Sequence, residues 1–355
     1  MARISRRDFN QPQQEAIPVP NLDTQRINYV SVDDTELLNR VNIAALESYN
    51  DNNIAYTSGV VKNVPLAQGS WSHRFKMRGK FSTDPSHHTA GQFIVGKTRP
   101  NSYVDVSIDR PLIEAEDLDN ADLDLTAHSE LDASVRECTR SIAELQDKRA
   151  IRLGILAART AAVTNVHNGG NVVERVAATL VAAYPLSSTG ATNFTEDLGS
   201  MGRLMDVDNV PPANRIAIIT PWIKQVITFG DKLFSRDYQD PMNAKYAERF
   251  IGRMEGFALL MSPTHMPESN ITSDLSKYNG NFVLGASSQR QPVALCLAGD
   301  GENYAIGSVE RSPLQIKVYE SEDHDAIRVR ARVHQGMGVV APWCAGEIGI
   351  TTSAA

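Results

Sequence analysis

The stretch that decides the fold is Arg110-Pro111-Leu112-Ile113-Glu114-Ala115-Glu116-Asp117-Leu118, which leads into a long helical pattern from Ser129 to Thr160. Ser129-Glu130-Leu131-Asp132 resembles a capping box that opens a helix. Apolar residues then recur at alternating spacings of four and three, which predicts a helix about 48 Å long with one apolar face. These residues are Leu131, Val135, Cys138, Ile142 and Leu145. From Ile151 onward the pattern is apolar on more than one side, so the helix should begin half exposed and end buried.

Charge is distributed unevenly around this stretch. Between His73 and Arg99, six basic residues accompany a single acid, a net charge of +5. Between Asp105 and Asp132, ten acidic residues accompany a single base, a net charge of −9. Exposed ion pairs contribute only about 0–1 kcal/mol each, but two blocks of opposite sign can steer and align an association between copies of one chain. Two solvated faces that never meet are the alternative interpretation.

The basic block has the pattern of a β-hairpin. Trp71, His73, Phe75 and Met77 alternate with polar or basic residues, and Val104, Val106 and Ile108 alternate with Asp105, Ser107 and Asp109. This period of two predicts two strands, joined by a polar turn at residues 82–91. A two-stranded ribbon over residues 66–110 is unstable alone in water, so we expect it to lie on another surface.

The rest of the chain predicts a mixed α/β lobe over residues 171–310 and a hairpin near the C-terminus. The hairpin has an acidic turn at Glu320–Asp325, and a final strand follows near Ile348–Ile350. Within the lobe, helices are expected over Val172–Tyr184, Asn193–Met205 and Trp222–Phe229, and strands over Arg215–Ile219, Gly256–Met261, Phe282–Leu284 and Val293–Leu297.

Composition excludes several classes of protein. The chain has 355 residues, of which 42% are hydrophobic, so it can bury a sizeable core. Its 35 Lys+Arg against 42 Asp+Glu give a net charge of −7, which argues against nucleic-acid binding over the whole surface. Its three cysteines are far apart in sequence, which indicates neither a disulfide framework nor a zinc site. No apolar run approaches the roughly 18 residues of a membrane span, and no secretory signal is recognisable, so we expect a soluble intracellular protein.

Motifs with a chemical mechanism are absent from the sequence. There is no phosphate-binding loop, dinucleotide fingerprint or nucleophile elbow. His87-His88 and Asp323-His324-Asp325 are better explained as solvated turns than as metal sites, and the acids of residues 114–124 as a solvated or inter-subunit face than as an acid–base pair. Cys138 lies on the apolar helix face and is expected in the core. We therefore predict no catalytic residue, metal or cofactor.

The order of these parts resembles the major capsid proteins of tailed bacteriophages, which have the Hong Kong 97 fold, and in detail the short-tailed podovirus type. The likeness covers roughly residues 55–350, and its specificity is in the order and spacing of the motifs. The residues that carry it are 110–118 with the helix to Ala162, Val210-Pro211-Pro212-Ala213-Asn214-Arg215, Thr220-Pro221-Trp222, Phe250-Ile251-Gly252-Arg253-Met254-Glu255-Gly256-Phe257 and residues 328–339.

The resemblance implies an α+β fold made of five parts. These are an N-terminal arm at residues 1–55, an extended β-hairpin loop at 56–110, a peripheral domain with a long spine helix at 111–162, an α/β axial domain at 163–310, and the peripheral strands with their loop at 311–355. It also implies self-assembly into hexamers and pentamers of an icosahedral shell around double-stranded DNA, in a virion assembled in the host cytoplasm.

The partners implied are other copies of the chain, a separate scaffolding protein, a portal and a decoration protein. DNA would be enclosed without sequence-specific binding, no membrane is involved, and a lysine crosslink from Lys80 or Lys97 is not expected. Two alternatives stay open: an encapsulin-type compartment with the same fold, and a cytosolic α/β enzyme with a carboxylate or metal site. Inter-subunit contacts are expected at Arg74, Lys76, Arg78, Lys80, Lys97, Arg99, Glu114, Glu116, Asp117, Glu320, Glu322, Asp323, Arg328 and Arg330.

Overall fold

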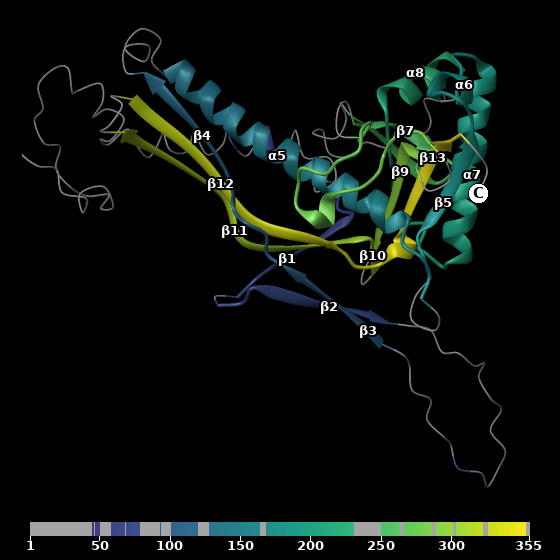
Figure 1. Ribbon diagram of the computed structural model, residues 1–355, viewed down its shortest axis with the longest axis horizontal. Coiled ribbons are helices and arrows are strands. Elements are labelled where there is room, and N and C mark those ends of the chain that lie inside the picture. Colours follow the sequence, from purple (N-terminus) through teal and green to yellow (C-terminus); the bar gives the residue numbers. More distant parts are fainter. Residues whose placement is uncertain are drawn as a thin grey trace, which may run out of the picture. The chain divides into compact units, whose positions relative to one another are not determined.

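The computed structural model describes most of the chain between residues 58 and 352. The described residues are 45, 47–49, 58–67, 69–78, 93, 101–119, 128–163, 168–230, 250–262, 266–285, 289–300, 303–321 and 326–352. They form helices, strands and short 3₁₀ helices in an α+β arrangement (Figure 1). In chain order these are β1 (Val61–Pro65), β2 (Ser72–Arg78), β3 (Asn101–Ser107), β4 (Leu112–Asp119), α5 (His128–Ala158), β5 (Asn171–Val176), α6 (Leu180–Ala183), α7 (Ser188–Val207), β6 (Arg215–Ile219), α8 (Pro221–Phe229), β7 (Phe250–Met254), β8 (Phe257–Met261), η3 (Ser276–Tyr278), β9 (Gln291–Asp300), β10 (Asn303–Tyr304), β11 (Ile306–Ser321), β12 (Ala326–Val339), η4 (Pro342–Cys344) and β13 (Ala345–Thr351).

The chain divides into two compact units, and four elements run through both of them. The smaller unit includes Glu114–Ser141 and Ile316–Ala331. The larger unit includes Ile142–Gln315 and Arg332–Ala355, together with the residues from Asn50 to Ile113. The elements α5, β4, β11 and β12 each have residues in both units.

The larger unit is organised around a mixed sheet with the strand order β5-β13-β9-β6-β8-β7, in which β10 also pairs with β9. The strand β13 lies between β5, to which it is parallel, and β9, to which it is antiparallel. The strands β6 and β13 are buried at every position, as expected for strands covered on both faces.

Two helices cover opposite faces of this sheet. A Cβ on Gly154 of α5 would lie 2.8 Å from Leu295 of β9, whereas one on Gly346 of β13 would lie 2.3 Å from Met201 of α7. Gly346 is paired with Cys296, the residue next to Leu295, and neighbouring residues of a strand point to opposite faces. The second half of α5 and the helix α7 therefore sandwich the sheet, and their apolar residues form one core with it.

A second sheet has the strand order β1-β11-β12-β4. The strands β11 and β12 form the predicted C-terminal hairpin, although both are longer than the alternating pattern indicated. The strand β1 runs parallel to β11. In β4, residues Ile113–Asp117 are all exposed.

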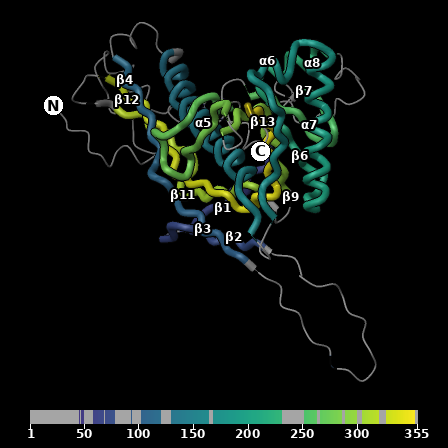
Figure 2. Tube along the Cα trace, turned by 45° about the vertical axis from the view of Figure 1, so that its right-hand side comes forward, coloured from purple at the N-terminus to yellow at the C-terminus, as the bar shows by residue number. Residues whose placement is uncertain are grey.

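The two strands of the predicted ribbon are confirmed as the antiparallel pair β2–β3 (Figure 2), whereas the predicted turn at residues 82–91 lies outside the described residues. Arg74 of β2 is paired with Asp105 of β3. Its apolar side chains Phe75, Met77 and Val106 are buried against Val309 and Val340. Two glycines of β12 make this approach possible. A Cβ on Gly336 would lie 2.1 Å from the carbonyl oxygen of Ser107, and one on Gly338 would lie 2.9 Å from Val106. The ribbon therefore rests on a face of β12 where Gly336 and Gly338 have no side chain.

Several sequence predictions are confirmed and others are wrong. The long helix is present, but it begins at His128, so Ser129 is a helical residue and not the cap. The expected helix over Val172–Tyr184 is instead the strand β5 followed by the short helix α6. Its β-branched residues favour a strand, and short apolar runs do not distinguish the two structures. No strand forms over Phe282–Leu284, and α7 begins at Ser188, five residues earlier than expected.

Candidate subunit interface

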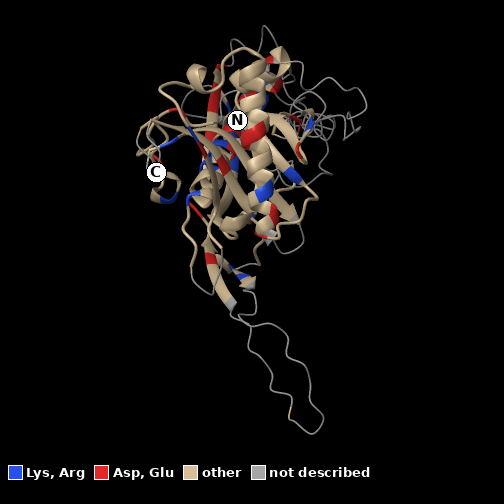
Figure 3. Cartoon of the chain, turned by 90° about the vertical axis from the view of Figure 1, so that its right-hand side faces the viewer, with Lys and Arg blue, Asp and Glu red and all other residues tan. Residues whose placement is uncertain are grey.

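The ribbon carries charges of both signs (Figure 3). Arg74 donates two hydrogen bonds to the carboxylate of Asp105 across the strand pair, at 2.7 and 2.9 Å. The hydrogen bond raises the pKa of Arg74 and lowers that of Asp105, although both side chains are exposed. Lys76 is also exposed and has no hydrogen-bond or ion-pair partner among the described residues. Of the ribbon side chains that the structure describes, Lys76 is therefore the cation best placed to meet another molecule.

A groove of about 230 Å³ lies beside β2. Its charged side chains, Lys62, Arg74 and Lys76, are all basic, and the Lys62 ammonium lies 5.5 Å from the centre of the Tyr304 ring. The remaining lining residues are His73, Phe75, Tyr304 and Val340. Arg74 is already paired with Asp105, so it is the positive charge of Lys62 and Lys76 that favours carboxylates in this groove.

The acids of β4, which were predicted to meet a neighbouring subunit, have partners on their own chain. Glu116 accepts a hydrogen bond from the hydroxyl of Ser134 at 2.6 Å, and Glu114 accepts one from Ser141 at 3.3 Å. Arg328 of β12 forms a bidentate ion pair with Asp117. Its Nε donates to Oδ1 of Asp117, and its Nη2 donates to Oδ2 at 2.6 Å. These carboxylates remain exposed, so the contacts fix their directions without removing them from solvent.

The other predicted contact residues are partly described. The guanidinium of Arg330 lies 5.8 Å from the centre of the Tyr319 ring. The hydrogen bond to Asp117 raises the pKa of Arg328. Lys80, Lys97, Arg99, Glu322 and Asp323 lie outside the described residues, as do the side chains of Arg78 and Glu320. Their predicted contacts stay predictions.

Cys138 lies in the core, as the sequence predicted. It is buried on α5, and burial, together with the nearby carboxylates of Glu116 and Glu114, raises the pKa of its thiol to about 11. Such a thiol is almost entirely protonated at neutral pH and is a poor nucleophile. Cys296 and Cys344 are also buried and free.

The sequence did not reveal the ion pairs made by the second half of α5 and by Arg159, which directly follows it. No basic residue lies in the last turn of this helix. Instead, Arg149 and Arg152 bind Asp274, and Arg159 binds Glu347. These partners are separated by more than one hundred residues, so no local spacing could have indicated them.

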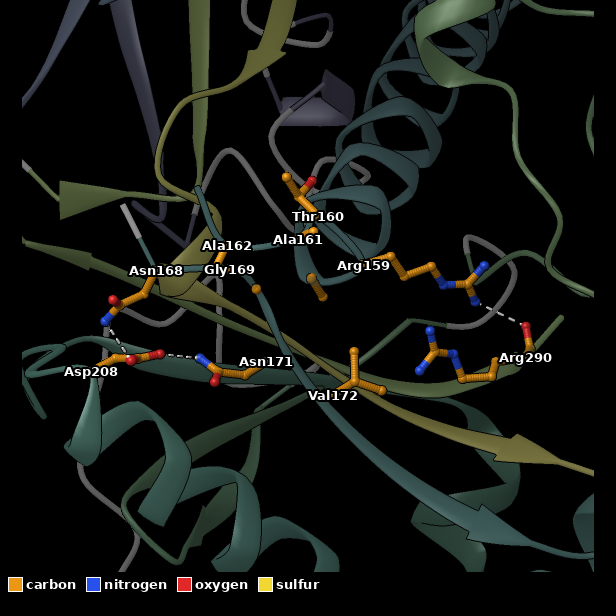
Figure 4. Close-up of a pocket in the computed structure, with 12 residues that line it drawn as sticks. Arg159, Thr160, Ala161, Ala162, Asn168, Gly169, Asn171, Val172, Asp208 and Arg290 are labelled. Atoms are coloured by element: carbon orange, nitrogen blue, oxygen red, sulfur yellow. Dashed lines mark hydrogen bonds between the residues drawn. The ribbon is translucent and has the colours of Figure 1, made fainter. Parts of the chain in front are cut away.

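A polar cavity of about 480 Å³ lies at the end of α5 (Figure 4). Asp208 accepts hydrogen bonds from Asn168 at 2.7 Å and from Asn171 at 3.1 Å. Arg159 donates to the carbonyl oxygen of Arg290 at 2.9 Å, and Arg290 itself pairs with Glu174. The charged side chains that line the cavity, Arg159, Asp208 and Arg290, thus each have partners on the chain, which indicates a structural role.

Neither metal clusters nor membrane-spanning helices are found in the part of the chain that the structure describes. No group of three or more His, Cys, Asp or Glu side chains gathers there as a metal site. No helix there is long and apolar enough to cross a membrane. The turn Asp323–Asp325, considered above as a metal site, lies outside the described residues.

Comparison with known proteins adds to this geometry. No protein-family model and no curated protein matches the chain. Among solved structures, the capsid of cyanophage P-SCSP1u matches with a TM-score of 0.65 and 19% sequence identity, over 84% of this chain and 88% of that one. The mature capsid of bacteriophage PhiM1 matches with a TM-score of 0.62 and 16% identity, over 83% and 87% of the two chains. The chain has the Hong Kong 97 capsid fold.

A third capsid, that of Ralstonia phage GP4, has the same fold with a TM-score of 0.56 at 10% identity, over 84% of this chain and 89% of that one. The Hong Kong 97 fold predicted from the order of sequence motifs is thus confirmed. At these low identities the likeness establishes the fold, and the contacts between subunits have to be argued from the residues of this chain.

Proposed function

We propose that the chain is the major capsid protein of a tailed phage, a non-enzymatic subunit that assembles into hexamers and pentamers of an icosahedral shell around double-stranded DNA. The observation that supports this most directly is the likeness to phage capsid subunits over more than four fifths of both chains. The mostly buried ion pairs Arg149–Asp274, Arg159–Glu347 and Arg175–Asp197 fit the same role, because they hold the fold together.

The roles that we propose for the parts of the subunit are based on the five sequence ranges given above. The ribbon within residues 56–110 would reach a neighbouring subunit, and residues 111–162 and 311–339 would form the peripheral domain with α5 as its spine. Residues 163–310 would form the axial domain together with β13, which the predicted ranges assigned to the peripheral domain but which lies inside the sheet β5-β13-β9-β6-β8-β7. Residues 1–55 would be an arm. A scaffolding protein, a portal and a decoration protein are the proposed partners, the virion is the proposed location, and assembly would take place in the host cytoplasm.

The assembly contact that we propose joins the ribbon of one copy to acids of another. Lys62, Arg74 and Lys76 provide a basic groove, and Glu114, Glu116 and Asp117 lie along an exposed strand edge. Each exposed pair contributes about 0–1 kcal/mol, so a single contact is weak. In a closed shell the same contact repeats at every subunit, and multivalency makes the whole stable.

Electron microscopy of the recombinant full-length chain tests the proposal. The chain would be imaged in negative stain alone and after co-expression with the scaffolding protein of the same genome. Closed icosahedral shells are the expected result. Small shells loaded with a protein cargo would instead indicate a compartment, and a monomer that forms no particle under either condition would contradict the proposal.

A further inference from the structure

The point where the ribbon joins the body of the larger unit is held by one carboxylate. Asp109 follows β3 by two residues, and its side chain is only 9% exposed. Its backbone N–H donates to the carbonyl oxygen of Gln335 at 3.2 Å, and its own carbonyl oxygen lies 3.0 Å from Nε2 of His334. The main chain at the base of the ribbon is thereby fixed to β12.

The carboxylate of Asp109 binds the 3₁₀ turn η3. Its Oδ1 lies 2.5 Å from the ammonium of Lys277, which also donates to the carbonyl oxygen of Met337 at 2.9 Å. Its Oδ2 accepts a hydrogen bond from the Tyr278 hydroxyl at 2.5 Å. Burial raises the pKa of Tyr278 and the charge of Asp109 raises it further, so the phenol stays protonated and keeps donating.

The same turn is tied to α5 at its other end. Arg149 donates two hydrogen bonds to Asp274, at 2.9 and 2.5 Å, and Arg152 donates a third at 3.2 Å. The guanidinium of Arg149 also lies 4.9 Å from the centre of the Tyr278 ring. One buried aromatic side chain therefore touches both the carboxylate at the base of the ribbon and an arginine of the long helix.

We infer that Asp109 is the positioning residue of the ribbon, and that residues 274–278 couple the direction of the ribbon to α5. A rotation of the ribbon at Asp109 can break the mostly buried contacts of Asp109 with Lys277 and Tyr278. If these contacts hold, the rotation moves residues 274–278 and, with them, the arginines of α5 that bind Asp274. Charged groups in such places have discrete arrangements rather than a continuous range, because leaving one unpaired is costly. If the proposed function holds, a shift of α5 within an assembling shell would redirect the ribbon.

Hydrogen–deuterium exchange of the unassembled full-length chain tests the coupling without requiring a shell. Asp109→Asn should speed exchange about tenfold at the amide of Ile108, which is bonded to Trp71 at the base of the ribbon, and also in residues 149–152. Asp274→Asn, which weakens the contact with α5, should likewise speed exchange in residues 149–152 and also at the amide of Ile108 in the ribbon. Tyr278→Phe, which removes only one hydroxyl, should give a smaller effect at both places.

The chain contains a matched control. Asp197 also accepts a hydrogen bond from a buried tyrosine, Tyr184, and forms an ion pair with an arginine, Arg175, but it lies away from the ribbon. Asp197→Asn should speed exchange near β5 and α7 and leave both reporter segments unchanged. The inference is overturned if Asp274→Asn leaves Ile108 at the wild-type rate, or if Asp109→Asn and Tyr278→Phe change the ribbon alone. A chain that shows the coupling but forms no shell would contradict the proposed function and leave the coupling standing.

Discussion

Arg159 donates two hydrogen bonds, at 2.6 and 2.5 Å, to the carboxylate of Glu347, which is completely buried on the internal strand β13. Arg159 also donates to the carbonyl oxygens of Asn281 and Arg290. A buried ion pair contributes little net stability over an apolar pair of the same size, but the loss of one partner leaves an uncompensated charge. Glu347 therefore makes the position of Arg159, directly after α5, obligatory for the fold.

Replacement of Arg159 by leucine should lower the free energy of unfolding by about 3–5 kcal/mol, because Glu347 would remain charged and buried. Urea unfolding followed by circular dichroism measures the change. The control is Arg140→Leu, which breaks an exposed pair with Glu137 three residues away and should cost less than about 1 kcal/mol. Equal losses in the two variants would contradict the structural account, whereas partial recovery in Arg159→Leu with Glu347→Leu would support it.

Reversal of charge at Arg74, Lys76 and Arg78 together should block shell formation, but the structure allows a sharper experiment. Arg74 is already paired with Asp105, so its reversal also disturbs the ribbon. Lys76→Glu removes only an exposed side chain and should change the free energy of unfolding by less than about 0.5 kcal/mol.

Lys76→Glu should nonetheless reduce the yield of shells in sedimentation and negative-stain microscopy, while Lys76→Arg preserves the yield. Normal shells from Lys76→Glu would rule out this ribbon cation as an assembly contact. Reduced assembly would be informative only if the unfolding curve matched that of the wild type, which is the purpose of measuring both.

The close packing of the ribbon on β12 can be tested by adding one methyl group to a glycine of β12. Gly336→Ala places a Cβ 2.1 Å from the Ser107 carbonyl oxygen, which cannot yield without moving the ribbon. A destabilisation of about 1–3 kcal/mol is expected, with faster hydrogen exchange in β3. Gly199→Ala in α7 is the control, since its nearest neighbour would be 3.7 Å away, and alanine there should stabilise the helix by up to about 1 kcal/mol.

Stability should depend on pH through Asp274. Burial alone would raise its pKa, but the hydrogen bond from Arg149, with the backbone N–H of Leu275 and the charge of Arg152, lowers it below its ordinary value of 3.8. Because the folded pKa is depressed, the contribution is complete above the unfolded value and is lost as the pH falls through the folded value. The wild type should therefore lose more stability than Asp274→Asn between pH 5 and the acid limit. Parallel unfolding curves at every pH would contradict this assignment.

The sequence was sufficient to predict the elements in which apolar residues recur at a regular spacing. The apolar spacing from Leu131 to Leu145 identified α5, and alternation around Phe75 and Val106 identified β2 and β3, because each pattern reflects one buried face. It failed over Val172–Tyr184, where a short β-branched run precedes several alanines. In that segment, pairing with β13 decides in favour of a strand, and that partner is far away in sequence.

The candidate interface was predictable only as a set of charges. The sequence identified the basic ribbon and the acidic β4, but it could not indicate that Arg328 pairs with Asp117 across 211 residues. Nor could it identify Asp109, a single acid within a long acidic segment, as the one that holds the base of the ribbon. Both assignments depend on tertiary contacts, which leave no periodic signal in the chain.

The place of β13 between β5 and β9 has a consequence for synthesis of the protein. A ribosome has to release residues 345–351 before the central sheet can close, although its other strands emerged much earlier. A nascent chain stopped before that point would carry two unpaired strand edges, which are prone to aggregate. A product that stops before residue 345 thus lacks an internal strand of the sheet and would tend to aggregate instead of adopting this fold.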